Sequence, residues 1–465
     1  MKSDAQPYSS GGAGVIPIIL CGGAGSRLWP MSRSELPKPF IKLDDGQSLL
    51  QKAFLRASSL SQGSEILTIC NDKLLSKIRD EYTSINNENI KTSFILEPFG
   101  RNTAPAIAAA ASYISRQHSG QTIMLILAAD HLIEDLSTFQ ETVQQAEKLA
   151  LKGDLVTFGI PPDSPETGYG YIEYEETSVV KFVEKPSIEK ATEYLTSGRF
   201  LWNSGMFCFT AESVLNEMKL HCPGLLDTTT YCMDKSKKKN AESTYEMLLD
   251  SDSFQLVENI SFDYAVMEKT RKASVIHSDI GWSDIGDWKA LGDLAEPDAD
   301  NNRFQGQIIQ KNSHNTTVIS ENRTIGAIGL ENLIVVDTPD ALLISNKDET
   351  QNVREIYSQL DRENDPTARE HRNSEYSWGL SITLDKKDDH SIQKLIINPD
   401  KEVLIAKKDP ETSNFLSLRG KIMVSTKEST HSISQNESIS LFSESDITIR
   451  NLSRETAIVI VIRSA

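Results

Sequence analysis

A glycine-rich stretch near the N-terminus carries the residues best suited to binding phosphate. An apolar run over Val15–Leu20 is followed at once by three glycines, at Gly22, Gly23 and Gly25. Without a Cβ, their backbone N–H groups can approach an anion closely. Arg27 follows, and Lys38 lies between two prolines that favour an extended segment. Two cations beside an anion nest suit a triphosphate whose charge shifts during reaction. The spacing is neither GxGxxG nor a Walker loop, which would end in GKS or GKT.

Two aspartates could bind a divalent cation. Asp130 follows the apolar run over 122–128 after one alanine, and Asp284 lies in a turn flanked by Gly281 and Gly286. Mg²⁺ prefers a few carboxylates together with phosphate oxygens. A lone aspartate at a strand end is more often a helix cap or turn former, so Asp130 needs this second carboxylate to become a ligand candidate. His131 is interpreted as a packing residue.

A third group follows the short apolar run over 93–96. Thr103 or Asn102 can cap a helix whose body is the alanine run at 106–111. Such a helix N-terminus offers an anion site, and Glu97 and Arg101 add an acceptor and donors for the edge of a base.

A fourth group lies in three turns between the two aspartates. The turns read ETGYGYI (166–172), VEKP (183–186) and WNSGMF (202–207). Sugar recognition needs hydroxyl partners such as glutamate and asparagine, with backbone brought close by glycine, and the phosphate of a sugar needs a cation, for which Lys185 is suitable.

The elements that position these groups alternate between strand-like and helical patterns from Val15 to about Trp288. Strands are expected at 65–70, 93–96, 122–128 and 155–158, besides the first at 15–20. This alternation predicts a Rossmann-like α/β domain with a mostly parallel sheet. Ligands of such sheets gather at the carboxyl ends of the strands, where the groups described above begin.

Together the motifs resemble a known family. GGxGxRLxPxS followed by PKPF resembles the signature loop of sugar-1-phosphate nucleotidyltransferases, and Leu28-Trp29-Pro30 looks most like the mannose-1-phosphate guanylyltransferases. EPxxRNTAPA, TGYGYI, FVEKP and WNSGMF match the same family in order. FDYAVME (262–268) matches a further segment, interpreted here as a structural helix packed by Tyr264 and Met267.

The resemblance implies specific roles. Arg27, Lys38 and Lys185 would be catalytic, and Mg²⁺ would be held by Asp130 and Asp284. The sugar would be held by Gly170, Glu184 and Asn203, with Lys185 on its phosphate. The nucleotide would be bound by Gly22, Gly23, Gly25, Glu97, Arg101 and Asn102.

The rest of the chain is rich in β-structure. Short runs over 306–345 predict a β-solenoid-like module, and Val353, Ile356, Tyr357 and Leu360 follow at helical spacing. The last ninety or so residues predict a cupin-like barrel, which resembles the phosphomannose isomerase half of two-headed enzymes. The stretch over 403–416, where such cupins carry metal-binding histidines, contains none. We therefore expect a scaffold without isomerase activity.

The expected organisation is a flexible tail (1–14), a nucleotidyltransferase domain (15–295), a small β module with a helix (296–360), a linker (361–373) and the degenerate cupin-like domain (374–465).

Composition excludes some classes of protein. The 465 residues carry a formal net charge of −18, which argues against nucleic-acid or anionic-membrane binding. The five cysteines form no CxxC and are expected to be reduced thiols. No stretch is long and apolar enough for a membrane span, and the first 14 residues lack a secretion signal, so the cytoplasm is expected. The sequence leaves a homo-oligomer open.

The predicted function is transfer of GMP from GTP to mannose 1-phosphate. Two alternatives remain: a bifunctional enzyme that also isomerises mannose 6-phosphate, and a regulatory paralogue that binds nucleotide sugars without turnover. The lack of histidine in the stretch over 403–416 argues against the first alternative. The second is disfavoured because the expected catalytic and metal-binding residues are all present, namely Arg27, Lys38, Asp130 and Asp284.

Overall fold

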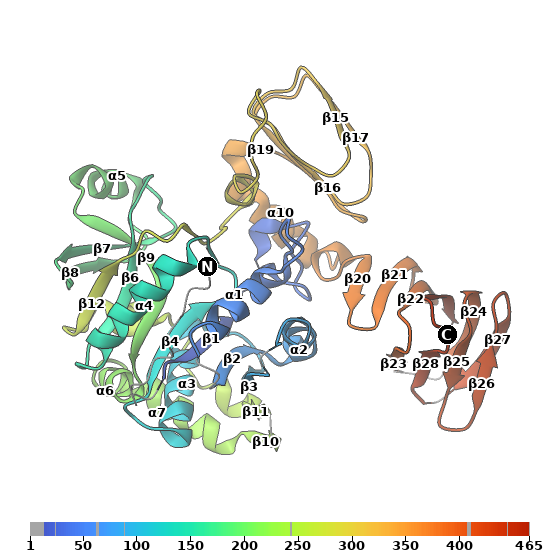
Figure 1. Ribbon diagram of the computed structural model, residues 1–465, viewed down its shortest axis with the longest axis horizontal. Coiled ribbons are helices and arrows are strands. Elements are labelled where there is room, and N and C mark those ends of the chain that lie inside the picture. The colour runs from blue at the N-terminus through green and yellow to red at the C-terminus, as the bar shows by residue number, and fades with distance from the viewer. Residues whose placement is uncertain are drawn as a thin grey trace, which may run out of the picture. The chain divides into compact units, whose positions relative to one another are not determined.

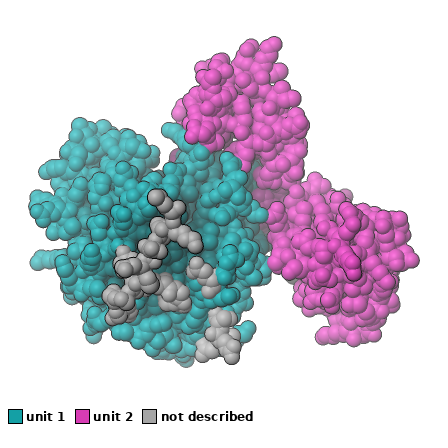
Figure 2. All heavy atoms as spheres, viewed as in Figure 1, with its two compact units in different colours: residues 1–294 teal, residues 295–465 magenta. Residues whose placement is uncertain are grey.

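The computed structural model describes residues 14–23, 25–61, 65–87, 89–241, 244–406, 411–443 and 445–464. All but one residue of the expected N-terminal tail therefore lie outside the described residues. The chain divides into two compact units, residues 1–294 and residues 295–465 (Figure 2). Among the described residues, no helix is long and apolar enough to cross a membrane.

The first unit is built on one large sheet (Figure 1). Its strands lie in the order β10 (Lys237–Ala241), β11 (Thr244–Leu248), β3 (Lys91–Glu97), β2 (Glu65–Asn71), β1 (Ile16–Cys21), β4 (Ile123–Ala128), β9 (Phe200–Thr210), β6 (Leu155–Ile160), β12 (Ala273–His277), β8 (Ser178–Val183) and β7 (Gly170–Glu175). From β11 to β4 neighbouring strands are parallel. The expected α/β fold with parallel strands is confirmed, and the five strands predicted from the sequence are β1, β2, β3, β4 and β6. Beyond β4 the sheet is mixed, because β9 runs antiparallel to both β4 and β6.

Helices cover both faces of this sheet. They are α1 (Leu49–Ser58), α2 (Leu75–Thr83), α3 (Thr103–Gln117), α4 (Leu136–Ala150), α5 (Ile188–Ser197), α6 (Ala211–His221), α7 (Pro223–Lys235), α8 (Ser251–Phe254) and α9 (Trp288–Gly292). β1 is buried on both faces, as expected for a central parallel strand: Ile16 and Ile18 belong to one core cluster, and Ile19 and Cys21 to the other.

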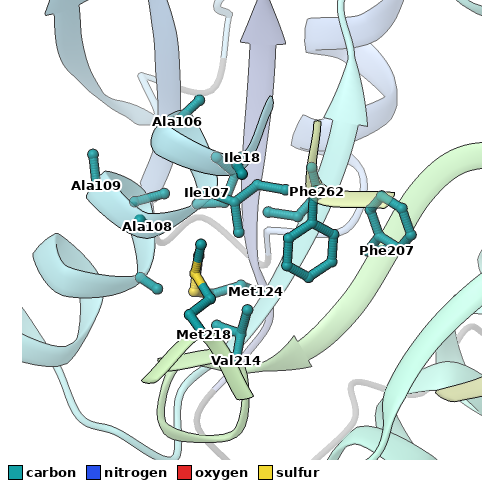
Figure 3. Close-up of a cluster of buried hydrophobic side chains, with 14 of the residues drawn as sticks. Ile18, Ala106, Ile107, Ala108, Ala109, Met124, Phe207, Val214, Met218 and Phe262 are labelled. Carbon is teal, nitrogen blue, oxygen red and sulfur yellow. The ribbon is translucent and has the colours of Figure 1, made fainter. Parts of the chain in front are cut away.

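The alanine run of α3 explains how the first of these clusters is packed. Ala108, Ala110 and Ala111 are fully buried, and α3 contacts both α6 and α7. Figure 3 shows Ile107 of this helix among Ile18, Met124, Met218 and Phe262. Small side chains let α3 lie close to its neighbours, which fixes the N-terminal end of the helix beside the end of β3.

The lysines at 237–239, expected in a solvated loop, form most of strand β10 instead. Among the described strands, β10 pairs with β11 alone and lies at the edge of the sheet. Lysine is a poor strand former, but pairing with a neighbouring strand overrides propensity, and charge on an edge strand discourages pairing with other chains.

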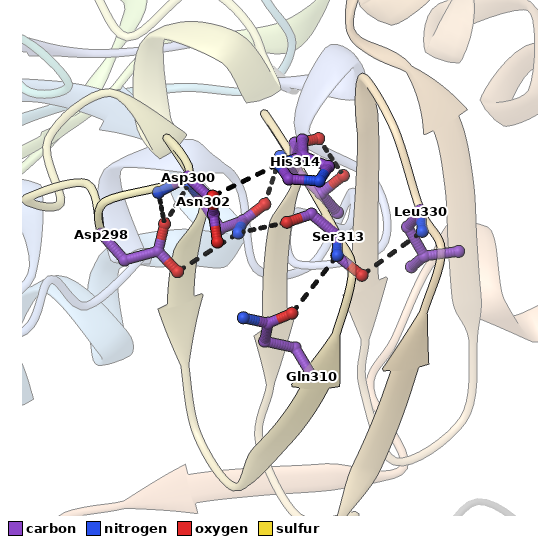
Figure 4. Close-up of polar contacts among 8 residues, drawn as sticks. Asp298, Asp300, Asn302, Gln310, Ser313, His314 and Leu330 are labelled. Atoms are coloured by element: carbon purple, nitrogen blue, oxygen red, sulfur yellow. Dashed lines mark hydrogen bonds and ion pairs between the residues drawn. The ribbon is translucent and has the colours of Figure 1, made fainter.

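The second unit begins with the expected β-solenoid. Parallel pairs join β14 (Arg303–Gln305), β16 (Thr317–Ser320) and β18 (Leu333–Asp337), and also β15 (Ile308–Lys311) and β17 (Ile325–Ile328); β19 (Leu342–Asn346) turns back along β18. Side chains link successive coils (Figure 4): Asn302 Nδ2 donates to Ser313 O at 2.8 Å, and Ser313 Oγ accepts from Leu330 N at 3.3 Å. The predicted helix is α10 (Val353–Arg362).

The C-terminal part is β-rich, as predicted. It consists of two antiparallel sheets around one apolar core. The six-stranded sheet contains β20 (Asn373–Tyr376), β21 (Gly379–Lys386), β22 (His390–Ile397), β29 (Ala457–Ser464), β24 (Glu411–Arg419) and β27 (Ser438–Ser443); the other contains β23 (Glu402–Ile405), β28 (Ile447–Asn451), β25 (Ile422–Ser425) and β26 (Thr430–Ile433). Residues 407–410, inside the stretch without histidine, lie outside the described residues.

Candidate functional site

The glycine loop begins where β1 ends. Gly22 and Gly23 are exposed, and Gly23 has a positive φ of 93°. Gly25 has a φ of 60°, and a Cβ added there would lie 2.5 Å from the Cβ of Lys38. Only glycine permits this approach, because a side chain would clash with Lys38 and its backbone conformation would be strained. The loop and the Pro-Lys-Pro segment therefore pack closely. The extended conformation expected at Lys38 is wrong, because Lys38–Phe40 form a turn of 3₁₀ helix.

Lys38 connects the two predicted metal ligands. Its Nζ donates to Asp130 Oδ2 at 2.8 Å and also to the backbone carbonyl of Asp284. The side chain is only 9% exposed, so this ammonium group is held in one place. The structure thus brings together Lys38, Asp130 and Asp284, which are far apart in the sequence. Arg27 is half-exposed, and no hydrogen bond or ion pair of the described residues involves it.

The ammonium group of Lys38 favours the ionised form of Asp130. Burial alone would raise the pKa of its carboxyl group, but the charge and hydrogen bond of Lys38 outweigh burial and lower it. Asp284 is fixed from its other side, because Tyr169 donates its hydroxyl hydrogen to Asp284 Oδ1 at 2.6 Å. The Tyr169 ring in turn packs edge-on against Trp202 and Trp282.

His131 packs beside the aspartates, as interpreted from the sequence. Its Nδ1 accepts a hydrogen bond from Trp282 Nε1 at 3.2 Å, and the two rings meet edge to face. Burial lowers the pKa of His131, which favours the neutral ring that this acceptor role requires. Within the described part of the chain, no three His, Cys, Asp or Glu side chains form a metal-binding group. Two aspartates fit a cation that completes its coordination with phosphate oxygens and water.

The end of β3 presents a buried carboxyl group. Glu97 is 9% exposed, and its Oε1 has no hydrogen-bond partner among the described residues. Burial raises the pKa of Glu97 to about 8. Four residues further along the chain, Arg101 Nη2 donates to Gln255 O at 2.9 Å and the Arg101 guanidinium lies over the Phe99 ring. Asn102 caps α3 by accepting from Thr103 N. An unpartnered buried acceptor is costly unless a ligand satisfies it.

The predicted sugar-binding residues also converge. A Cβ on Gly170 would lie 2.6 Å from Glu184 Oε2 and 3.3 Å from Asn203 Cβ, so the glycine leaves room for both side chains. Lys185, with a positive φ of 46°, places its Nζ 3.4 Å from Glu184 Oε1 and is mostly exposed. Tyr169 precedes Gly170, and its ring packs on Trp202, which precedes Asn203. It therefore lies between this group and the aspartates.

Sequence reasoning missed Asp263, whose segment was interpreted as structural. Asn203 Nδ2 donates to Asp263 Oδ1 at 2.9 Å. The segment Asp263–Met267 is one turn of π-helix, and Met267 is buried as expected. The expected packing of Tyr264 is wrong, because its side chain is 44% exposed. The signal available in the sequence was the match of FDYAVME to the family, combined with a carboxylate beside a buried phenylalanine.

Comparisons with known proteins agree with these motifs. Residues 16–301 match the family described as nucleotidyl transferase, and residues 306–360 match the mannose-phosphate isomerase/GMP-like β-helix domain. The chain is 37% identical over 430 residues to mannose-1-phosphate guanylyltransferase RfbM of Salmonella typhimurium, covering 91% of this chain and 88% of that protein. It is 37% identical over 398 residues to a mannose-1-phosphate guanylyltransferase of Escherichia coli, covering 83% of this chain and 84% of that protein.

Solved structures are similar as well. One described as a mannose-1-phosphate geranyltransferase from Thermus thermophilus has a TM-score of 0.65 and 27% identity, covering 75% of this chain and 99% of that one. A mannose-6-phosphate isomerase from Helicobacter pylori has a TM-score of 0.52 and 34% identity, covering 58% of this chain and 99% of that one. The resemblance stated from the motifs is therefore confirmed, and the chain belongs to the mannose-1-phosphate guanylyltransferase family of nucleotidyltransferases.

Proposed function

We propose that the protein transfers the GMP unit of GTP to mannose 1-phosphate, giving GDP-mannose and pyrophosphate. An oxygen of the sugar phosphate attacks the α-phosphorus of GTP, and the bond from that phosphorus to the bridging oxygen of the β-phosphate breaks. No covalent intermediate with the protein is needed, so catalysis depends on positioning and on stabilising charge. The observation that carries the proposal is the cluster of Lys38, Asp130 and Asp284 beside a glycine loop at the carboxyl ends of β1 and β4.

Each group of residues has a place in this reaction. The N–H groups of the glycine loop bind the triphosphate, and Arg27 and Lys38 stabilise the negative charge that develops on the departing pyrophosphate. Glu184 and Asn203 hold the sugar, and Lys185 orients the attacking phosphate.

We also propose a Mg²⁺ requirement, with Asp130 and Asp284 as the residues that would hold the ion. The lowered pKa of Asp130 and the hard oxygen donors fit this ion. When bound, Mg²⁺ would supply Lewis-acid stabilisation of the reacting phosphates.

Product analysis tests the reaction. Purified protein incubated with GTP, mannose 1-phosphate and Mg²⁺ is expected to form GDP-mannose, identified by chromatography and mass spectrometry. Loss of the product when Lys38→Met replaces the wild type would attribute it to this site. GTP consumption without a nucleotide sugar would contradict the proposal.

Glu97 predicts a pH dependence of GTP binding. Guanine presents N–H groups that a carboxylate accepts, and adenine lacks the exocyclic amine at that position. Because burial raises the pKa of Glu97 to about 8, binding below that pH must release a proton. The KM for GTP should therefore fall as the pH rises from 7 to 8.5, by up to about tenfold per unit below the pKa. Steady-state kinetics over this range, with Glu97→Gln as comparison, measures the effect. The glutamine variant should lose the dependence, and an identical profile in both proteins would refute this role.

Tyr169 predicts a smaller effect on turnover. Tyr169→Phe keeps the ring on Trp202 and Trp282 but removes the hydrogen bond to Asp284, so Asp284 loses its fixed orientation. A hydrogen bond to a charged group contributes about 1.5–3 kcal/mol, so kcat should fall roughly tenfold or more, with a higher Mg²⁺ concentration needed for half-maximal rate. Rates measured across a Mg²⁺ titration check this. Tyr174→Phe, a change outside the aspartate group, is the control, and equal behaviour of the two variants would rule out the role.

A further inference from the structure

The amide of Asn203 can be oriented in only one way. Its Oδ1 lies 3.2 Å from the backbone N of Gly205, and a backbone N–H is always a donor. The atom facing Gly205 must therefore be the oxygen, which fixes the nitrogen on the other side. The Thr157 hydroxyl, fully buried, lies 3.0 Å from the same oxygen. Thus Asn203 Nδ2 faces Asp263, and Asp263 Oδ1 accepts one of its two hydrogens.

We infer that Asp263 is a positioning residue for the sugar phosphate: it holds Asn203 so that the second amide hydrogen is presented to a sugar hydroxyl oxygen. This inference rests on the proposed function. With Oδ1 occupied by Gly205 and one hydrogen occupied by Asp263, the remaining N–H is the polar group that Asn203 can offer a ligand. Asn203 is 9% exposed, so an amide with this little access to solvent has few other partners for that hydrogen.

Glu184 is the second side chain, besides Asn203, that would recognise the sugar hydroxyls. Its Oε2 and the Asn203 Cβ both lie against the same point beside Gly170. A carboxylate accepts hydrogen bonds, whereas the oriented amide of Asn203 donates one. The site therefore fits a sugar with one hydroxyl that donates to Glu184 and a neighbouring hydroxyl whose oxygen accepts from Asn203. A site built in this way rejects analogues that lack either hydroxyl much more strongly than a purely apolar pocket would.

The electrostatic interaction between the carboxyl groups of Glu184 and Asp263 also points to a binding role. Burial and the charge of Glu184 raise the pKa of Asp263 to about 6, so ionising this carboxyl group costs free energy. A residue needed for packing alone would not have to carry this cost. Asn203 and Lys185 both act to lower that pKa. Groups whose ionisation is opposed in this way gather at functional sites.

Steady-state kinetics of variants at Asp263 tests the inference. Asp263→Ala should raise the KM for mannose 1-phosphate at least about tenfold, as expected when one partner of a buried hydrogen bond is removed, and leave the KM for GTP within about twofold. Asp263→Asn keeps an oxygen acceptor for Asn203 Nδ2 and should recover most of the affinity. Tyr264→Ala, in the same turn but exposed, is the matched control and should behave as wild type.

Exchanging the side chains at positions 203 and 263 tests whether their hydrogen bond serves sugar recognition or only stabilises the fold. In the Asn203→Asp/Asp263→Asn double variant the hydrogen bond between the positions can re-form, but the amide no longer donates toward the sugar. We expect the melting temperature to recover relative to Asn203→Asp while the KM for mannose 1-phosphate stays high. Recovery of both would overturn the inference, as would an unchanged KM in Asp263→Ala.

The exchange also decides the matter if Asp263→Ala does not fold, because it keeps both side-chain volumes. Failure of the proposed function is distinguishable: the wild-type protein would then form no GDP-mannose, whereas failure of the inference leaves an active wild type and variants with an unaltered KM.

Discussion

Replacing Lys38 with methionine should lower kcat for GMP transfer about 10²–10³-fold, the loss found when a single preorganised electrostatic donor is removed from an active site. Methionine keeps much of the side chain's length and apolar volume but removes the ammonium that now contacts Asp130 and the carbonyl of Asp284. The reaction then loses a positive charge beside the glycine loop. The measurement is the steady-state rate of pyrophosphate release at saturating GTP and mannose 1-phosphate.

The control must show that the rate falls because a positive charge is lost at this site, and not because the protein has lost any one lysine. Lys152, exposed at the opposite end of the sheet strands, offers a matched substitution, and Lys152→Met should turn over at the wild-type rate. Because Lys38→Met leaves Asp130 without its cation, thermal melting must show that the variant is folded. A folded Lys38→Met protein with kcat within about threefold of wild type would exclude the catalytic role of this lysine.

Asp284→Asn should lower the turnover rate about 10³-fold or more, because a carboxylate that would hold the cation of the reacting phosphates lowers the barrier by several kcal/mol. Asparagine keeps the shape of the side chain and still accepts from the Tyr169 hydroxyl, so the local structure should survive. The rate is measured against Mg²⁺ concentration, and the residual activity should require more Mg²⁺ than the wild type does.

Asp279 provides the comparison for this substitution, because it is exposed on the segment that leads to Asp284. Asp279→Asn should change neither the rate nor the Mg²⁺ dependence. An Asp284→Asn protein with a normal circular dichroism spectrum, normal turnover and normal Mg²⁺ dependence would show that this carboxylate is not a ligand.

The local parts of the site could be predicted from the sequence, because short motifs determine short-range geometry. The Asn102 cap of α3 is an example, because the capping side chain lies next in sequence to the helix that it caps. The positions of Glu97 and Asp130 at the carboxyl ends of strands could also be predicted, because the apolar stretches before them were interpreted as parallel strands.

Contacts between distant segments could not be predicted in this way. The hydrogen bond from Lys38 to Asp130 spans 92 positions, and the bond from Tyr169 to Asp284 spans 115. The second bond depends on β9, because β7, which begins one residue after Tyr169, pairs with β9. No local pattern indicates that β9 enters the sheet antiparallel between β4 and β6. Asp263 was missed for the same reason. Its partner Asn203 is 60 positions away, and the apolar neighbours of Asp263 suggested packing instead.

The measurement that tests the central claim most directly is pyrophosphate release from the purified full-length protein over a panel of substrate pairs. GTP, ATP and dTTP are each combined with mannose 1-phosphate and glucose 1-phosphate in the presence of Mg²⁺. The account predicts release with GTP and mannose 1-phosphate, dependent on both substrates and lowered about 10³-fold by Asp284→Asn. Release only with another pair would keep the mechanism but contradict the assigned base or sugar. No release with any pair, from protein shown to be folded, would contradict the account and favour a regulatory nucleotide-sugar-binding protein.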